Sequence, residues 1–255
     1  MRSIKEYREG KRGFTLVEMA IVLVIIGIIL AGVMKGRDIV RGSQIKQFSQ
    51  GFAQKWLTIA STYYDKKGQP LFDGPTNGSN ATTTPPDGRM DGRMLAQPAG
   101  GEAGQFADDR DNVLTYLRLV GIEPCTMIKS DLEDASADCG AGGYNVFERM
   151  VDGEFTGKQR VGVGFYNYVI STGGPNRNVV LIQNVPVDVG IGLDTVIDGQ
   201  ADGQGGSCIV VNLSAANADY STNAFTPAAT GSTVTPLAWG TDSTMLAVIG
   251  LVLDY

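Results

Sequence analysis

The strongest hydrophobic pattern in the sequence is an apolar run near its start. Residues 14–34 (FTLVEMAIVLVIIGIILAGVM) contain one ionisable side chain, that of Glu18. As a helix, the run would be about 30 Å long, which matches the hydrocarbon core of a bilayer. A helix that is apolar on every side has no face for water, so the run predicts a membrane span and not a soluble core helix. A plain secretory signal peptide is the alternative, although its apolar region is usually shorter, about 7–15 residues.

From Lys35 the pattern becomes amphipathic. Apolar side chains recur at steps of three and four residues, which is the spacing of one helical face: Ile45, Phe48, Phe52, Trp56, Ile59 and Tyr63. No proline interrupts this pattern before Pro70, and Gly68 is suited to end the helix. We therefore expect one long helix over residues 14–64. Its first half would pack in a membrane or against sister helices, and its second half would lay its aromatic face on a globular head.

The segment after this helix differs in composition. Residues 65–105 are rich in Gly, Pro, Thr, Asn and Ser, which predicts a flexible surface loop or linker. Such a loop either contacts neighbouring molecules or has no role, and composition does not decide between the two.

Residues 106–255 contain one helical pattern followed by strand-like runs. The helix is expected at 108–120, and the runs cover 144–151, 160–171, 178–185, 208–213 and 245–253. A Thr-Gly-Gly-Pro turn at 172–175 joins two of these runs into a predicted hairpin. Successive strands beside one long helix predict an α+β fold, in which the amphipathic half of the long N-terminal helix packs on an antiparallel β-sheet head.

Composition and net charge reduce the number of functions that the chain can have. The 255 residues are 43% hydrophobic and 19% charged, which suits a folded domain. The formal net charge is −6, yet residues 1–13 carry five basic and two acidic side chains, so the remainder is at −9. An acidic body is a poor binder of nucleic acid, because phosphate contacts need a basic face. We expect no nucleic-acid partner.

Catalytic and metal chemistry are restricted by what the composition lacks. The sequence has no His, which excludes Ser-His and Cys-His catalysis and the usual zinc sites built on His. Its three Cys cannot form a four-thiolate zinc or iron–sulfur site within one chain. The glycine-rich stretches lack the lysine and the strand-to-helix context of a phosphate loop. We therefore predict a protein that is not an enzyme, with no catalytic residues, no cofactor and no metal.

Glu18 is the informative residue of the apolar run. A carboxylate within hydrocarbon costs on the order of 3 kcal/mol. It is tolerated if it is protonated, if it lies near the lipid headgroups, or if it has a positive partner. Removing residues 1–13 would create such a partner, a new amine on Phe14. Within one helix this amine and Glu18 are about one turn apart, and between two staggered helices they could pair directly.

The residues Lys11-Arg12-Gly13-Phe14-Thr15-Leu16-Val17-Glu18, followed by the apolar run, resemble the type IV prepilin signature. The resemblance implies that a membrane prepilin peptidase cuts after Gly13 and that Phe14 is then N-methylated. It also implies that Glu18 supports assembly into a helical filament, either a type IV pilus or a type II secretion pseudopilus. Many pilins carry a proline near the position held here by Lys35, and this chain does not.

The same resemblance implies a location and partners. Residues 1–13 would be a cleaved leader and residues 14–34 a single span of the bacterial inner membrane. The head would lie outside the cytoplasm, on the periplasmic side, and would later reach a filament or the cell surface. The expected partners are the prepilin peptidase, other pilin-like subunits and the assembly platform machinery. A minor or tip component for adhesion, a secreted substrate or DNA uptake stays open, as does a membrane-anchored outer domain that never polymerises.

Two further patterns lie in the head. Cys125 and Cys139 enclose 13 residues, and we favour a disulfide between them over the two pairings with Cys208. Such a bridge would stabilise the fold by about 3 kcal/mol. Asp194, Asp198 and Asp202 are spaced by four residues, so on one helix their carboxylates would share a face. One interpretation of this spacing is a calcium-binding site, because calcium takes oxygen ligands. Helix capping and a solvated turn are favoured, because Gly199 and Gly203 suggest that the helix ends there.

Overall fold

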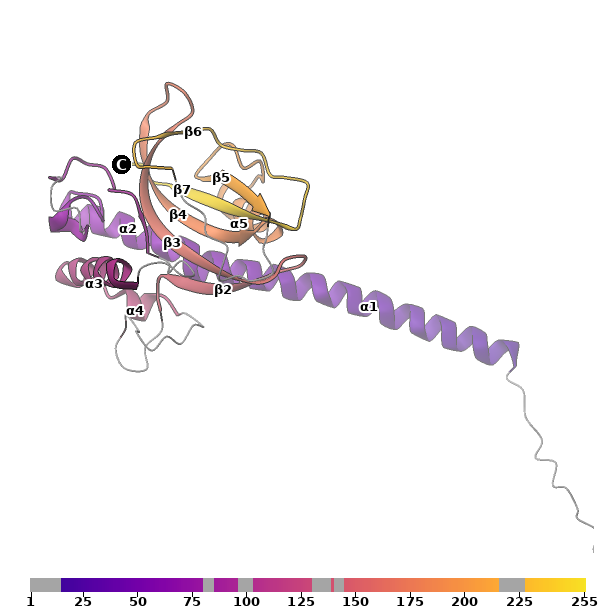
Figure 1. Ribbon diagram of the computed structural model, residues 1–255. Helices are drawn as coiled ribbons and strands as arrows, with labels where there is room; N and C mark the ends of the chain where they lie inside the picture. Colours follow the sequence, from indigo (N-terminus) through magenta and orange to yellow (C-terminus); the bar gives the residue numbers. More distant parts are fainter. Residues whose placement is uncertain (1–14, 80–84, 96–102, 130–138, 140–144, 216–227) are drawn as a thin grey trace, which may run out of the picture. The chain divides into compact units, whose positions relative to one another are not determined.

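The protein is described from a computed structural model (Figure 1). The structure describes residues 15–79, 85–95, 103–129, 139, 145–215 and 228–255, with the backbone alone for 103–108. The proposed leader and Phe14 lie outside these residues. The chain divides into two compact units, residues 1–44 and residues 45–255. The second of these units contains residues 45–64, the amphipathic part of the long helix that was expected to pack on the head.

The long helix is present. It consists of α1 (Leu16–Phe48), a π-helical segment η1 (Ser49–Ala53) and α2 (Gln54–Lys67). Gly68 ends it in a left-handed conformation with a φ of 72°, and the Gly68 amide donates to the carbonyl of Tyr64 at 2.7 Å. Glycine adopts this conformation without the strain that a Cβ would add, so the predicted stop at Gly68 is confirmed.

The π-helical segment keeps the aromatic face aligned. Each of its turns takes more than four residues, where an α-helical turn takes 3.6. The steps of four residues from Phe48 to Phe52 to Trp56 therefore stay on one side of the helix. Phe48 and Phe52 stack with their ring centroids 5.8 Å apart, and Trp56 is fully buried. The amphipathic pattern thus identified the buried face of α2 correctly.

In the part of the chain that the structure describes, seven strands form one sheet. They are β1 (Arg93–Met94), β2 (Glu148–Gly153), β3 (Gly157–Ile170), β4 (Asn176–Pro186), β5 (Cys208–Ala215), β6 (Thr233–Val234) and β7 (Met245–Val252). The order is β1-β3-β4-β7-β5, and β2 and β6 also pair with β3. All pairs are antiparallel except β3 with β6. The predicted hairpin is β3 and β4, in which Phe165 lies opposite Val180.

The main core lies between this sheet and α2, which crosses one sheet face in Figure 1. The Trp56 ring stacks on Phe147 with a centroid distance of 5.2 Å and meets the Phe165 ring edge-on at 5.7 Å. The Trp56 indole N–H donates to the carbonyl of Val146 at 3.2 Å, so its polar atom is satisfied inside the core. These contacts attach the second half of the long helix to the sheet, as the aromatic spacing predicted.

The opposite face of the sheet carries a second, smaller core. Side chains alternate along β3, so Phe165 faces α2 while Tyr166 and Tyr168 face the other way. The two tyrosine rings stack with centroids 5.6 Å apart. The Tyr168 hydroxyl donates to the carbonyl of Ala228 at 3.2 Å, so the segment that leads into β6 lies against this face.

Part of residues 65–105 is buried, where a surface loop was expected, although positions such as 75, 76 and 87–89 are exposed. Its apolar side chains Leu71, Phe72, Met90 and Leu95 are buried in the main core. The Asp73 carboxylate is also buried and accepts hydrogen bonds from two backbone amides across the loop, at 3.0 and 2.9 Å. A few dispersed apolar residues and side-chain hydrogen bonds therefore build this segment into the head, which its average composition did not reveal.

The remaining helices flank the sheet. They are α3 (Ala103–Leu119), α4 (Pro124–Met127) and α5 (Val187–Asp198), with a short 3-10 turn, η2 (Pro75–Asn77). The predicted helix at 108–120 is α3, which begins five residues earlier. The buried carboxylate of Glu148 on β2 pairs with Arg110 of α3 at 3.2 Å and also with Arg160 of β3. Because a buried charge is costly without partners, this network fixes α3 against the sheet.

Candidate functional site

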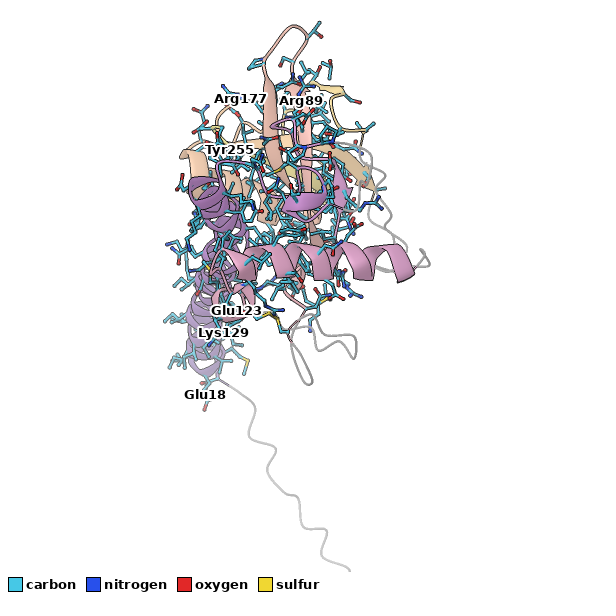
Figure 2. All side chains as sticks on the ribbon, turned by 90° about the vertical axis from the view of Figure 1, so that its left-hand side faces the viewer. Glu18, Arg89, Glu123, Lys129, Arg177 and Tyr255 are labelled. Atoms are coloured by element: carbon cyan, nitrogen blue, oxygen red, sulfur yellow. A yellow bond between two sulfur atoms is a disulfide. The ribbon has the colours of Figure 1, made fainter. Side chains whose placement is uncertain are left out.

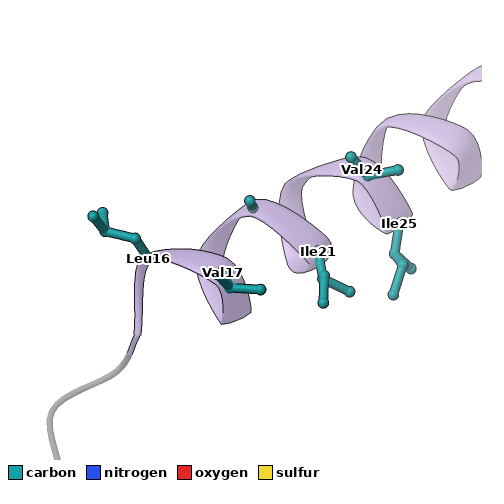
Figure 3. Close-up of a pocket in the computed structure, with 6 residues that line it drawn as sticks. Leu16, Val17, Ile21, Val24 and Ile25 are labelled. Atoms are coloured by element: carbon teal, nitrogen blue, oxygen red, sulfur yellow. The ribbon is translucent and has the colours of Figure 1, made fainter.

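The apolar part of α1 is the first candidate site. Among the described residues it is the one helix long and apolar enough to cross a membrane. The large apolar side chains of this run are exposed, between 41% at Met19 and 90% at Leu16. Figure 3 shows Val17, Ile21 and Ile25 pointing to the same side of the helix, one turn apart. An apolar surface of this extent requires lipid or other helices to cover it.

The first turn of α1 contains a reciprocal set of hydrogen bonds. The Thr15 amide and hydroxyl donate to the Glu18 carboxylate at 2.8 and 2.9 Å, and the Glu18 amide donates to the Thr15 hydroxyl at 3.2 Å. This is a capping box, in which the residue before the helix and the third helical residue satisfy each other's free amides. Figure 2 labels Glu18 at this end of the helix.

The capping box explains how the chain itself accommodates Glu18. The N-terminal end of a helix carries a partial positive charge from its unpaired amides, which favours a carboxylate. Glu18 therefore lies in the first turn of α1, where it is stabilised, and not in the middle of the apolar run. A helix cap was not among the three explanations given above for Glu18: protonation, a place near the lipid headgroups, or a positive partner. The Thr-x-x-Glu spacing of residues 15–18 was the signal that could have revealed the cap.

The expected processing site cannot be placed next to this cap. Gly13 and Phe14 lie outside the described residues, so the geometry of the scissile bond and of the Phe14 amine stays a prediction. The described chain begins one residue after Phe14, at Thr15.

The head contains one disulfide among its described residues. Cys125 and Cys139 are joined, with their Cα atoms 5.7 Å apart. The Arg118 guanidinium lies 3.6 Å from the Cys125 sulfur and pairs with Glu123 at 2.9 Å, so α3 and α4 are tied together beside the bridge. Cys208 is a buried free thiol at the start of β5. Burial and the nearby carboxylates of Asp194 and Asp198 raise its pKa, which makes it a poor nucleophile.

The three spaced aspartates after β4 do not share a helical face. Gly199 ends α5 in a left-handed conformation with a φ of 78°, so Asp202 lies beyond the helix. Among the described residues, no group of three or more Asp, Glu, Cys or His side chains is placed to hold a metal ion.

Each of the three carboxylates instead accepts backbone amides. Asp194 accepts from Gly203 at 3.0 Å and also from the Trp239 indole at 2.7 Å. The other two cap the turns that follow: Asp198 accepts from Ser207 and Cys208 at 3.0 and 2.8 Å, and Asp202 from Gln204 and Gly205 at 2.8 and 2.9 Å. These bonds support the capping interpretation over calcium binding. Burial raises the pKa of Asp194, whereas the amide bonds lower that of Asp202.

Comparison with known proteins adds one result to this geometry. A family model described as the prokaryotic N-terminal methylation motif matches residues 8–34. Together with the long apolar N-terminal helix, the match fits a type IV prepilin-like protein. No curated protein and no solved structure matches the chain.

The matched motif has consequences for the class of protein. It points to a structural, pilin-like family and not to an enzyme. It implies processing by a prepilin peptidase and assembly with other pilin subunits. A single apolar helix near the N-terminus is compatible with single-pass anchoring in an inner membrane.

Proposed function

We propose that this chain is the precursor of a type IV pilin-like structural subunit, cut after Gly13, N-methylated at Phe14 and assembled into a pilus or a type II secretion pseudopilus. The observation that carries the proposal is the exposed apolar helix α1, whose first turn holds the capped carboxylate of Glu18 directly after the Lys-Arg-Gly-Phe motif.

The physical basis of assembly is the burial of apolar helices against one another. Each copy of α1 removes its apolar side chains from lipid or water when it packs on sister helices. Burying the Glu18 carboxylate in such a bundle is costly unless a positive charge accompanies it. The cut after Gly13 would supply that charge as the Phe14 amine of a neighbouring copy, and N-methylation would leave the charge in place.

In this proposal the apolar helix first anchors the precursor in the inner membrane with the head on the periplasmic side. The basic leader, at net +3, favours the cytoplasmic side for the N-terminus. The prepilin peptidase removes the leader, and the assembly platform then transfers the subunit from lipid to the filament. In both settings the helix contacts an apolar environment, so the same side chains serve both stages.

Mass spectrometry of the N-terminus tests the proposal. Membrane and filament fractions from cells with and without the prepilin peptidase would be compared. We expect mature protein that begins at N-methylated Phe14 and full-length precursor where the peptidase is missing. Gly13→Ala and larger replacements should block the cut. Gly27→Ala is the matched control, because a Cβ at Gly27 has no atom within 4 Å. Filaments built from chains that still begin at Met1 would overturn the proposal.

A minor or tip component is the second candidate. It is favoured by the size of the head unit, residues 45–255, which exceeds what helix packing alone requires. Counting this chain in isolated filaments separates the two: a fibre-forming subunit is abundant, and a tip component is present in few copies. Detergent-extracted monomers with no larger assembly in cells would instead indicate a membrane-anchored domain that does not polymerise.

A further inference from the structure

A groove of about 560 Å³ runs along the head between α2, α5 and the end of β7. All of its lining residues belong to the unit of residues 45–255. They are Gln54, Leu57, Ser61, Tyr64 and Asp65 on α2, Val196 and Ile197 on α5, and Ser207, Val252, Leu253, Asp254 and Tyr255. None of the lining residues belongs to α1 or to the capping box.

The charged side chains that line the groove are both acidic. Asp65 and Asp254 are exposed, and the lining contains no Lys or Arg. A lining that combines apolar side chains with two carboxylates is suited to a side chain with an aliphatic stem and a cationic end.

An aromatic pair and one unsatisfied hydroxyl complete the wall. The rings of Tyr64 and Tyr255 stack with centroids 3.9 Å apart and planes 8° from parallel. Figure 2 shows Tyr255 beside the end of α2. The Tyr255 hydroxyl is buried and has no hydrogen-bond partner among the described residues. Burial of such a group normally requires a partner, and aromatic faces attract cations. A tyrosine hydroxyl is neutral near pH 7 and its oxygen can accept a hydrogen bond from a cationic donor.

The chain itself carries a segment with the complementary charge. Residues 35–46 of the long helix contain four basic side chains, Lys35, Arg37, Arg41 and Lys46, and one acidic side chain, Asp38. The head unit contains 13 basic and 23 acidic residues and therefore has a net charge of −10. Lys35 and Lys46 are both exposed, and their separation of 11 residues, close to three helical turns, places them on one face.

We propose that the acidic groove binds the basic helical segment 35–46 of a second copy of this chain, with its cationic side chains between Asp65 and Asp254 and against the Tyr64–Tyr255 pair. The inference rests on the proposed function, because copies inserted in one membrane have parallel helices. The groove residues on α2 lie about 20 residues after the middle of the basic segment. The contact therefore requires two parallel copies displaced by about 30 Å along their helices.

Site-directed crosslinking in assembled filaments tests the contact. Two differently tagged copies of the full chain would be expressed together, one with Ser61→Cys in the groove and one with Lys35→Cys or Lys46→Cys. Mild oxidation should produce a heterodimer. Replacing the groove cysteine by Ser171→Cys, at an exposed turn after β3, is the matched control and should give at least about tenfold less heterodimer. The native cysteines do not interfere, because Cys125 and Cys139 are bridged and Cys208 is buried.

Charge reversal tests the chemistry of the same contact. Asp65→Lys with Asp254→Lys should lower the crosslink yield and the filament yield by at least about fivefold, and adding Lys35→Glu with Lys46→Glu should restore both. Restoration also shows that the groove variant folds. Asp111→Lys with Asp152→Lys makes the same change in net charge at exposed positions outside the groove and should have little effect.

The possible outcomes distinguish this inference from the proposed function. Processed filaments that form normally with the reversed groove, or that give no crosslink above the control, overturn the groove contact and leave the pilin-like function intact. Chains that keep Met1 and form no filaments overturn the proposed function, and the groove contact with it.

Discussion

The indole N–H of Trp239 donates a hydrogen bond of 2.7 Å to the carboxylate of Asp194, which lies 45 residues earlier in the chain. The indole lies directly against α5 at Gly190, where an added Cβ would be 2.5 Å from the ring. The pair ties the segment before β7 to α5 and gives a buried carboxylate a charge-assisted partner. Two predictions about the stability of the head follow from it.

Asp194→Asn should change the pH dependence of stability. Burial raises the pKa of Asp194 above its ordinary value of about 3.9, so between these two values the folded state binds more protons than the unfolded state. The stability of the native chain should therefore fall as the pH rises through this window and level off above the folded-state pKa.

Asparagine keeps an oxygen acceptor for Trp239 and Gly203 but does not titrate. The free energy of unfolding of the variant minus that of the native chain should rise with pH from about pH 4, by about 1.4 kcal/mol per unit of pKa elevation. Urea titrations of the detergent-solubilised chain measure it, and a difference independent of pH would contradict the role assigned to Asp194.

Trp239→Phe should destabilise the head by about 1–3 kcal/mol, because the buried carboxylate then loses its indole donor while it keeps the amide of Gly203. In the Asp194→Asn background the same change should cost less, since an amide is easier to bury than a charge. A double-mutant cycle measured by denaturant unfolding gives the coupling energy. Equal costs in the two backgrounds would show that Trp239 acts through packing alone.

Cys125→Ser with Cys139→Ser should lower the stability of the head by about 3 kcal/mol, the value expected for a bridge that closes a loop of this size. For a unit of about 200 residues, this loss corresponds to a fall in Tm of roughly 6–12 °C. Calorimetry with and without reductant measures it. Cys208→Ala is the control for loss of a thiol, and reductant should not lower the Tm of the double serine variant any further. A native chain whose Tm is insensitive to reductant would contradict the prediction.

The elements that the sequence predicted correctly are those with local signals. The long helix and its end at Gly68 follow from spacing that is visible along the chain, and so does the hairpin of β3 and β4. The two-residue strands β1 and β6 were not expected, because a strand that short has no periodicity and exists only through pairing with β3.

Residues 65–105 illustrate what composition conceals. Their Gly and Pro content is typical of a surface loop, yet Leu71, Phe72 and Met90 are buried. The Tyr63 hydroxyl on α2 also donates to the Asn77 side chain at 2.9 Å, and Asn77 in turn bonds to the loop backbone. The Tyr63–Asn77 bond joins the helix to a loop residue 14 positions later, and such a side-chain partner is not visible in the composition of the segment.

Thr15→Val should loosen the first turn of α1. It removes the hydroxyl that donates to Glu18 and accepts from the Glu18 amide, at an expected cost of about 1 kcal/mol. Hydrogen exchange of the first amides of the helix should then become about fivefold faster in detergent micelles. Thr15→Ser keeps a hydroxyl and should exchange at nearly the native rate. Equal exchange in the valine and serine variants would show that the capping box does not stabilise this end of the helix.

Substitutions at Glu18 separate its two roles. Glu18→Gln keeps an oxygen that accepts from Thr15 but has no charge, whereas Glu18→Ala loses both the cap and the charge. If the charge neutralises the Phe14 amine of a neighbouring subunit, both variants should leave the cut after Gly13 intact and lower filament incorporation by at least about tenfold. This loss corresponds to about 1.4 kcal/mol, well below the cost of leaving a buried charge unpaired.

If the cap alone matters, Glu18→Gln should assemble normally while Thr15→Val fails. N-terminal mass spectrometry and immunoblots of sheared filaments measure the two steps separately. Normal assembly of Glu18→Ala would contradict both roles, and the apolar face of α1 would then be sufficient for assembly.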